Sequence, residues 1–292
     1  MWSGCLTALI TPFREGGAVD YEALGRVVEA QIAGGVQGLV PAGSTGEAAT
    51  LTHEEHAQVV RAVVEMARKR VPVIAGTGSN ATAEAIRLTQ EAERAGADGA
   101  LLISPYYNRP PQEGIFRHYQ AVAAATRLPL LVYNIPSRTA SNILPDTMVR
   151  LAAIPNVVGV KEASGSMGQV QAVLSTCGPD FAVLSGDDAM TLPIMTAGGR
   201  GVIAVTSHLV PERMSRMAAA LAAGRLDEGR AEALALFPLI DALMTLDVNP
   251  IPVKTALALR GVCREEFRLP LVPMAPGPRE RLRTVLQSHG LL

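Results

Sequence analysis

Lysine is scarce in this chain, and the position of one lysine makes it a candidate nucleophile. Of 26 basic residues only Lys69, Lys161 and Lys254 are lysines, so arginine supplies almost every other positive charge. Lys161 ends the apolar run 157–161, where an unpaired ammonium group would be costly. An amine, unlike a guanidinium, can lose its proton and attack a carbonyl carbon, and burial favours that neutral form. We therefore interpret Lys161 as a Schiff-base lysine.

A purely structural interpretation of Lys161 would pair its ammonium group with an acidic side chain. The next residue is Glu162, but neighbours in a strand point to opposite faces, so we expect Glu162 to face away. Lys69 stands between two arginines at a predicted helix end, which is typical of a solvated surface. Lys254 follows Asn-Pro-Ile-Pro-Val and begins a predicted helix, so neither lysine ends a strand as Lys161 does.

A glycine-rich segment with two hydroxyl groups follows another apolar run. Gly43-Ser-Thr-Gly-Glu-Ala48 contains two glycines that permit a tight turn, and it leads towards a helix. The hydroxyls of Ser44 and Thr45, together with free backbone N–H groups, are suited to a carboxylate or a phosphate. The alternative is an ordinary turn, since serine, threonine and glycine are common turn residues.

Tyrosine and arginine side chains follow two further apolar runs. Tyr106 and Tyr107 lie in Ser-Pro-Tyr-Tyr-Asn-Arg-Pro-Pro, and Tyr133 opens Tyr-Asn-Ile-Pro-Ser-Arg-Thr, which also holds Arg138. A phenol can relay a proton, and an arginine can hold a carboxylate through two hydrogen bonds. The structural alternatives are aromatic packing for one of the paired tyrosines and a weak surface ion pair for the arginine.

Acidic and histidine side chains form no clear metal-binding pattern. Asp187 and Asp188 close Ser-Gly-Asp-Asp without further ligands at a suitable spacing, so we expect them to cap a short helix over 189–196. His53 and His56 are three residues apart, again without the other ligands of a zinc site. The three cysteines are widely separated and form no CxxC pair, which fits a reducing compartment.

These candidate groups follow apolar runs that recur along the chain and alternate with amphipathic, alanine-rich stretches. The runs are mostly continuous rather than alternating, as in strands that are covered on both faces. They span residues 6–10, 38–42, 71–76, 99–104, 128–134, 157–161, 181–185 and 201–206. The stretches between them predict helices that include 21–33, 53–70, 83–95, 113–126 and 145–153. The expected N-caps are Asp20, Thr52, Thr82 and Asp146, and the expected stops are Gly34 and Gly96.

Eight strand–helix units predict an α/β fold, a (β/α)8 TIM barrel over residues 1–224. Residues 225–292 form a C-terminal helical domain, with helices expected over 226–246, 251–260 and 278–289. An open doubly wound sheet is the alternative. Its usual dinucleotide signature is missing, however, because Gly76-Thr-Gly78 is followed by Ala81 instead of a third glycine. In a barrel, the reactive side chains gather where the strands end.

Composition narrows the class of protein further. The 292 residues are 48% hydrophobic and 18% charged, which is enough apolar material for a sizeable core. A formal net charge of −1 argues against a nucleic-acid or anionic membrane partner. The apolar first ten residues have no lysine or arginine before them and are cut short by Pro12, so we expect no signal peptide and a cytoplasmic location.

Together these motifs resemble the dihydrodipicolinate synthase (4-hydroxy-tetrahydrodipicolinate synthase) family, within the pyruvate-dependent class I aldolase superfamily. The resemblance covers almost the whole chain, and its motifs lie at residues 43–47, 105–110, 133–139, 160–164, 185–188 and 249–254. Tyr-Tyr-Asn-Arg-Pro and Pro-Ser-Arg-Thr favour the synthase over a sialic-acid or keto-deoxy-sugar lyase, which remains the alternative function. A catalytically idle barrel that only senses a keto acid or lysine is a further alternative.

The resemblance implies a lyase that condenses pyruvate with L-aspartate 4-semialdehyde, the committed step of diaminopimelate and lysine biosynthesis. It implies no metal or organic cofactor and a homotetramer built as a dimer of dimers. Lys161 would form an iminium with pyruvate. Tyr133, Thr45 and Tyr107 would relay protons, with Tyr107 reaching in from a neighbouring subunit.

Substrate and effector positions are also carried over from the resemblance. The substrate-binding residues would be Ser44, Thr45, Arg138, Gly186 and Ile203, with Arg138 on the carboxylate of the semialdehyde. A feedback site for L-lysine would comprise Ala49, His53, His56, Asn80, Glu84 and Tyr106. The chain departs from the usual family pattern at Ser44, where threonine is more frequent, and at Ala48, where serine is common. We expect the second departure to weaken lysine binding.

Overall fold

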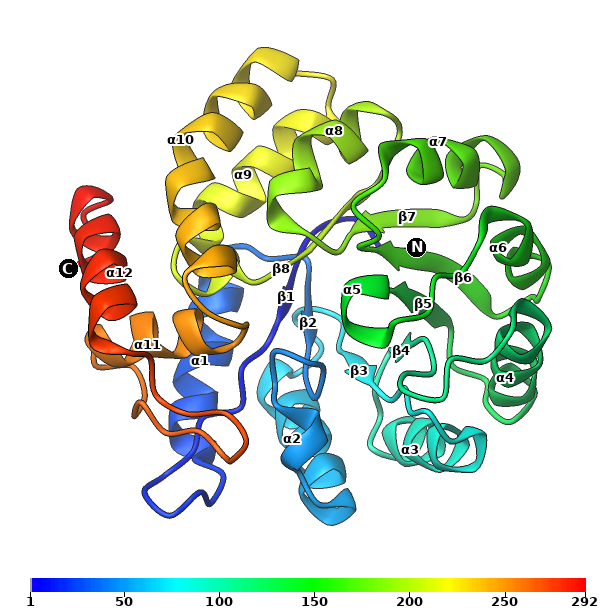
Figure 1. Ribbon diagram of the computed structural model, residues 1–292, viewed down its shortest axis with the longest axis horizontal. Helices are drawn as coiled ribbons and strands as arrows, with labels where there is room; N and C mark the ends of the chain where they lie inside the picture. Colours follow the sequence, from blue (N-terminus) through cyan, green and yellow to red (C-terminus); the bar gives the residue numbers. More distant parts are fainter. Residues whose placement is uncertain (1) are drawn as a thin grey trace.

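The computed structural model describes residues 2–292 and confirms the predicted (β/α)8 barrel with C-terminal helices (Figure 1). All eight strands pair in parallel, and helices surround them on the outside. The strands are β1 (Gly4–Ala8), β2 (Gly38–Val40), β3 (Ile74–Gly76), β4 (Gly99–Ile103), β5 (Leu130–Asn134), β6 (Val157–Glu162), β7 (Ala182–Ser185) and β8 (Gly201–Ala204). Each lies within or beside one of the predicted apolar runs.

Closure of the sheet excludes the open doubly wound alternative. The strand order is β2-β1-β8-β7-β6-β5-β4-β3, and a parallel bridge between Leu39 and Val73 joins the two ends. The N–H of Leu39 donates to the Pro72 carbonyl with an N···O distance of 3.0 Å, which is typical of a protein hydrogen bond. The carboxyl ends of all eight strands therefore open on one face of the barrel, as a shared site requires.

The helices follow the predicted order, with small shifts at their ends. They are α1 (Tyr21–Ala33), α2 (His53–Ala67), α3 (Thr82–Arg94), α4 (Gln112–Ala124), α5 (Pro136–Thr139), α6 (Pro145–Ala152), α7 (Met167–Thr176), α8 (Thr191–Thr196), α9 (Pro211–Ala222), α10 (Leu226–Thr245), α11 (Ile251–Leu259) and α12 (Pro276–Ser288). Thr52 caps α2 as predicted, in a reciprocal capping box with Glu55. Asp20 caps α1 by accepting from the Ala23 N–H at 3.1 Å.

Two of the predicted N-caps are wrong. Thr82 is the first residue of α3, not its cap, and Ala81 precedes it in extended conformation. Asp146 lies in the first turn of α6 because Pro145 starts that helix. A proline is well suited to the first helical position, since its missing N–H would have no partner there. An aspartate in the first turn still interacts favourably with the helix dipole.

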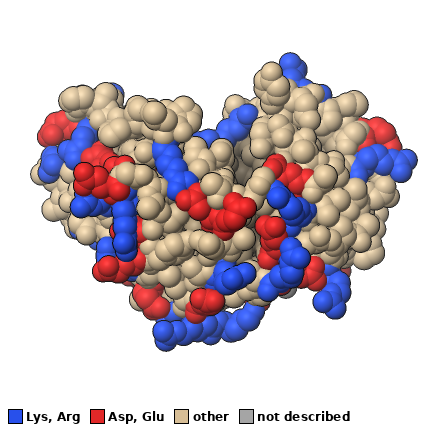
Figure 2. Space-filling model, turned by 90° about the horizontal axis from the view of Figure 1, so that it is seen from below, with Lys and Arg blue, Asp and Glu red and all other residues tan. Residues whose placement is uncertain are grey.

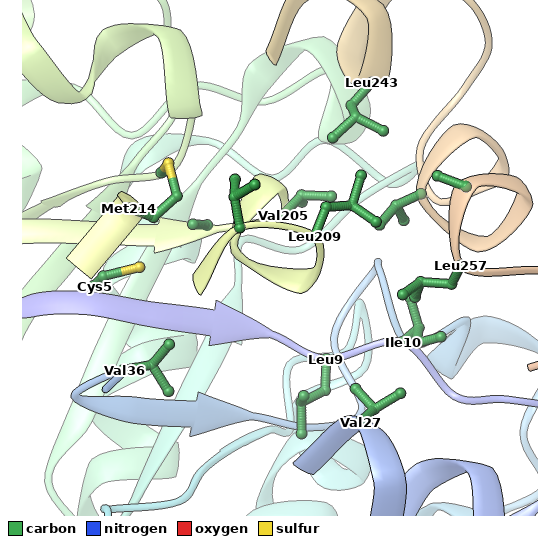
Figure 3. Packing of buried hydrophobic residues seen from close by; sticks show 14 of the residues in the cluster. Cys5, Leu9, Ile10, Val27, Val36, Val205, Leu209, Met214, Leu243 and Leu257 are labelled. Atoms are coloured by element: carbon green, nitrogen blue, oxygen red, sulfur yellow. The ribbon is translucent and has the colours of Figure 1, made fainter. Parts of the chain in front are cut away.

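The apolar core lies both inside the barrel and between the barrel and its helices. Figure 3 shows part of the outer cluster, in which Leu243 of α10 and Leu257 of α11 join Leu209 and Ile10 from the barrel. Burying one leucine side chain contributes about 1.5–3 kcal/mol. The C-terminal helices therefore share a core with the barrel, and the boundary at residue 224 stays a prediction.

The surface carries both signs of charge. Figure 2 shows lysine and arginine side chains interspersed with aspartate and glutamate on one face of the molecule. Many of these charges form exposed pairs, such as Arg26 with Glu22 and Arg117 with Glu113. Within residues 2–292, no helix combines the length and the apolar character needed to cross a membrane.

Candidate active site

A cavity of about 790 Å³ opens at the carboxyl ends of the strands, where the barrel fold places functional groups. Residues from several strand ends and the loops after them line it, together with residues of the C-terminal helical segment. Six of the predicted catalytic and substrate-binding residues meet there: Ser44, Thr45, Tyr133, Arg138, Lys161 and Gly186. The structure thus brings together most of a site that the sequence spreads over more than 140 residues.

Lys161 ends its strand inside this cavity and is only 6% exposed. In the sheet register it is the partner of Tyr133 on β5, and its Nζ lies 4.2 Å from the centre of the Tyr133 ring. Glu162 faces away, as predicted. Its carboxylate accepts from the Ser164 N–H at 2.7 Å and from the side-chain amides of Asn134 and Gln169. No ion pair from Glu162 therefore holds Lys161 in its charged form.

Burial changes the proton affinity of both groups. It lowers the pKa of Lys161 to about 8, although the nearby Asp188 carboxylate opposes the change. At pH 7 roughly one Lys161 in ten is then a neutral amine, against about one in several thousand for an ordinary lysine. Burial also raises the pKa of Tyr133 to about 12, so its phenol stays protonated near neutral pH. The pair offers a nucleophile and a proton donor.

The loop after β2 folds into a turn that supports Ser44 and Thr45. The N–H groups of Gly46 and Glu47 donate to the Gly43 and Ser44 carbonyls at 3.0 and 3.2 Å. Among the described residues, the N–H groups of Ser44 and Thr45 make no backbone hydrogen bond, so both can bind a substrate carboxylate. The backbone N–H groups of Ser44 and Thr45 are therefore available to an anion, whereas those of Gly46 and Glu47 are already bonded within the loop.

Glycine is required at position 186 by the space around it. An added Cβ would lie 2.8 Å from the Ala163 Cβ and 3.0 Å from the Lys161 Cγ, both shorter than normal contacts. Gly186 lines the cavity, whereas Ile203 packs in the barrel interior with Tyr133 and is not among the lining residues. A direct contact between Ile203 and pyruvate stays a prediction.

The two aspartates after β7 have separate roles, so the prediction that they cap a helix holds for only one of them. Asp187 accepts from the Ala189 N–H at 2.9 Å and caps the short helical turn, as expected. Asp188 is buried and instead accepts from the N–H groups of Val205 and Thr206 at 3.0 and 2.7 Å. It thereby links the ends of β7 and β8. The sequence could not show this because Val205 and Thr206 lie 17 and 18 positions further along the chain.

Arg138 lies on α5 at the cavity mouth and is exposed. Its Nη2 donates to the Asn249 carbonyl at 3.0 Å, and within residues 2–292 it forms no ion pair with a carboxylate. The described residues therefore give no support to the alternative of a surface ion pair. A guanidinium whose charge is not neutralised is suited to an incoming carboxylate.

Tyr107 is not brought into the cavity by its own chain. Its side chain is 90% exposed, and its backbone has a φ of 70°, in the left-handed region. Tyr106, by contrast, lines the cavity. A catalytic role for Tyr107 needs a second subunit, as the resemblance implied, and stays a prediction.

Most of the residues proposed for lysine binding line the same cavity as Lys161. His53 Nε2 is 2.6 Å from Glu84 Oε1, and His56 Nε2 is 2.7 Å from the Gly76 carbonyl. Ala49, His53, His56, Glu84 and Tyr106 are lining residues. Asn80 is not, and its carbonyl accepts from the side chain of Asn108 at 2.9 Å.

Asn249 is a residue of the site to which the sequence assigned no role. Its side-chain Nδ2 donates to Thr45 Oγ1 at 3.0 Å, and its carbonyl accepts from Arg138. The only signal in the sequence was its place in Asn-Pro-Ile-Pro-Val-Lys, because nothing local shows that this segment returns to the barrel mouth.

The chain matches the model of the Dihydrodipicolinate synthetase family over residues 1–289. It belongs to this family. A 4-hydroxy-tetrahydrodipicolinate synthase from Syntrophus aciditrophicus is 51% identical over 292 residues, and the alignment covers all of both chains. The membership confirms the resemblance drawn from the motifs and identifies the chain as an aldolase-type lyase.

Solved members of the dihydrodipicolinate synthase family share this fold closely. The chloride-inhibited enzyme from Acinetobacter baumannii, complexed with pyruvate, is 42% identical, with a TM-score of 0.98 and full coverage of both chains. The enzyme from Cyanidioschyzon merolae with lysine bound is 40% identical, with a TM-score of 0.96 and 99% coverage of both chains. The barrel and its C-terminal helices are thus the common frame of this family.

Proposed function

We propose that the protein condenses pyruvate with L-aspartate 4-semialdehyde to give 4-hydroxy-tetrahydrodipicolinate, the committed step towards diaminopimelate and lysine. The observation that carries this proposal is the buried Lys161 amine beside Tyr133 at the end of the barrel. Family membership and the pyruvate complex of the Acinetobacter baumannii enzyme support the choice of first substrate. We expect the reaction to take place in the cytoplasm.

The first step is attack of the neutral Lys161 amine on the keto carbon of pyruvate. The carbinolamine that forms loses water and becomes an iminium ion, whose positive nitrogen withdraws electrons from the neighbouring methyl group. Loss of a methyl proton then gives an enamine. The carboxylate of pyruvate would lie on the Ser44 and Thr45 N–H groups, beside the Lys161 amine in the same cavity.

Proton transfer in these steps is assigned to Tyr133 with Thr45. A phenol with a pKa of about 12 gives its proton to the carbinolamine oxygen only when a partner returns one, so a relay is needed. The Thr45 hydroxyl lines the same cavity and is 4% exposed. Tyr107 of a neighbouring subunit would extend the relay to solvent, which requires at least a dimer. We propose the homotetramer of the family resemblance.

The second substrate is held by Arg138 through its carboxylate. The enamine carbon attacks the aldehyde carbon, and the resulting alkoxide takes up a proton. The amine of the semialdehyde then attacks the iminium carbon, which closes the ring and releases Lys161 as a free amine. Each Schiff base is thus made and broken within one turnover, with no oxidant or reductant consumed.

L-Lysine is proposed as a feedback inhibitor that binds at His53, His56, Glu84 and their neighbours. The Glu84 carboxylate suits an ammonium group, and the lysine complex of the Cyanidioschyzon merolae enzyme supports an effector of this kind. At position 48 this chain has alanine where serine is common in the family, so a hydroxyl group is missing near this site. A binding titration with L-lysine tests the site, and a titration without saturation would overturn it.

The reaction itself is tested by supplying pyruvate and L-aspartate 4-semialdehyde and following product formation. We expect turnover with this pair and none when N-acetylmannosamine or a short sugar aldehyde replaces the semialdehyde. Turnover with a sugar aldehyde alone would instead assign the chain to the sugar lyases of the superfamily.

A further inference from the structure

A buried ion pair joins α11 of the C-terminal segment to the loop that carries Thr45. The Lys254 Nζ lies 2.5 Å from Glu47 Oε1, and both side chains are 0% exposed. The ammonium group also lies 4.3 and 4.8 Å from the ring centres of Phe13 and Phe267, positions that favour a cation. A charge pair taken fully out of water is not an efficient way to stabilise a fold. Its position next to the active-site loop needs another explanation.

Glu47 adopts a backbone conformation in the loop that is unfavourable for a residue other than glycine. It has a φ of 52°, in the left-handed region that residues other than glycine rarely adopt. Its second carboxylate oxygen accepts from the Arg268 N–H at 3.4 Å, so both oxygens bind residues of the C-terminal segment. The pair therefore fixes the loop against this segment at a position two residues beyond Thr45.

The same segment contacts the loop a second time, at Thr45 itself. Asn249 precedes α11, and its Nδ2 donates to Thr45 Oγ1 at 3.0 Å. The N–H of Lys254 donates to the Pro250 carbonyl at 3.0 Å, so Asn249 and Lys254 lie on adjoining turns of one ordered segment. A shift of Lys254 relative to Glu47 would therefore also displace the amide of Asn249 from the Thr45 hydroxyl.

The hydrogen bond from Asn249 occupies an acceptor position of the Thr45 hydroxyl and leaves the hydroxyl hydrogen for another partner. A hydroxyl that accepts from an amide N–H keeps its own hydrogen for a different acceptor. Thr45 lines the cavity that also holds Tyr133 and Lys161, so its hydroxyl hydrogen is available to an acceptor there. Loss of this contact would let the hydroxyl rotate and donate elsewhere.

We propose that Lys254 and Glu47 are positioning residues for the condensation, which hold the Thr45 loop on α11 so that Asn249 orients the Thr45 hydroxyl for proton transfer. This inference rests on the proposed function, because it takes Thr45 as a member of the relay. The C-terminal segment then contributes to catalysis without any side chain of Lys254 or Glu47 touching the substrate.

The test compares the rate of methyl-proton exchange with the amount of Schiff base formed on Lys161. The variant E47Q/K254M removes both charges at nearly constant volume, so no unpaired charge is left buried, as it would be in either single variant. Exchange of the pyruvate methyl protons with deuterated water, followed by NMR, reports enamine formation. Borohydride trapping with pyruvate reports the iminium on Lys161, and the melting temperature reports folding.

We expect E47Q/K254M to fold and to form the trapped adduct, but to exchange methyl protons about 10- to 100-fold more slowly than the wild type. Asn249→Asp keeps the ion pair but puts a negatively charged carboxylate, which only accepts, where the amide N–H donated to Thr45, so it should show the same slow exchange. The matched control is Lys69→Met, since Lys69 is an exposed lysine paired with Asp98, and it should behave as the wild type.

Exchange at the wild-type rate in folded E47Q/K254M would overturn the proposal. Should that double variant not fold, Asn249→Asp decides, and a wild-type rate of exchange in it would overturn the proposal equally. Failure of the proposed function is distinguishable, because the wild-type protein itself would then give no product from pyruvate and L-aspartate 4-semialdehyde.

Discussion

The Lys161 amine lies 4.2 Å from the centre of the Tyr133 ring, and neither residue is more than 7% exposed. Adjacent positions on β5 and β6 fix this arrangement, because the two residues are partners in the sheet register. An ammonium group above an aromatic face is attracted to it, yet burial disfavours the charge. Burial lowers the pKa of Lys161 to about 8, even with the Asp188 carboxylate nearby.

Removing the Tyr133 hydroxyl should slow proton transfer without preventing adduct formation. Tyr133→Phe keeps the ring beside Lys161, so we expect the packing and the melting temperature to change little. The loss of an acid–base group should reduce kcat by about 100-fold or more. Steady-state kinetics measure this, and Tyr21→Phe, at a half-buried surface tyrosine, is the control that should retain full activity. A kcat within twofold of wild type would remove Tyr133 from the relay.

Arg138→Ala should weaken binding of the second substrate more than that of pyruvate. The guanidinium carries the positive charge that would face the semialdehyde carboxylate, and losing a charged hydrogen bond costs about 1.5–3 kcal/mol. We therefore expect KM for the semialdehyde to rise at least tenfold. Borohydride trapping with pyruvate alone should stay near the wild-type level. Unchanged semialdehyde kinetics would contradict the role given to Arg138.

A methyl group at position 186 should disturb Lys161 directly. Gly186→Ala places a Cβ about 3.0 Å from Lys161 Cγ, so the lysine side chain or the strand must move. Overpacking of this kind costs about 1–3 kcal/mol, and we expect loss of stability together with slower adduct formation. Gly168→Ala is the matched control, because its nearest neighbour is 3.8 Å away and it lies in α7. Equal activity of the two variants would show that the site tolerates the displacement.

Two buried histidines should make the protein less stable in mild acid. Burial lowers the pKa of His118 and of His208 to about 4. In the unfolded chain both titrate near 6.5, so between pH 6.5 and 4 the unfolded state binds more protons than the folded state. Their contribution to stability is therefore complete above pH 6.5 and is lost as the pH falls towards 4, by roughly 3 kcal/mol for each.

Urea unfolding at a series of pH values measures this loss, with His118→Phe as the comparison. Phenylalanine keeps an aromatic ring beside Tyr119, where the His118 ring packs edge-on. The variant should lose less stability than the wild type between pH 6.5 and 4. Parallel curves for the two proteins would show that His118 does not titrate as a buried neutral group.

The sequence predicted the architecture well because each strand and most helices have a local signal. The continuous apolar run at 157–161 and the Thr52 capping signal of α2 each arise from neighbouring residues. Position at a strand end then identified Lys161 and Tyr133, because a barrel collects those ends on one face.

What the sequence could not provide were contacts between distant segments. Asn249 reaches Thr45 across 204 positions, and Glu47 meets Lys254 across 207. Nothing near Lys254 in the sequence distinguishes an ammonium group buried against a glutamate from an ordinary helix lysine, so its buried ion pair was not predicted. The role predicted for Tyr107 depends on a second chain, so a single chain cannot place this side chain at the site.

Reductive trapping tests the central claim most directly. Borohydride added with pyruvate should convert the iminium into a stable secondary amine on Lys161 and stop turnover. Trypsin would then fail to cleave after Lys161, and mass mapping should find the modified peptide 151–200. The Lys161→Ala variant should form no adduct. Modification of Lys69 or Lys254 instead, or continued turnover with Lys161 unmodified and cleaved normally by trypsin, would contradict the account.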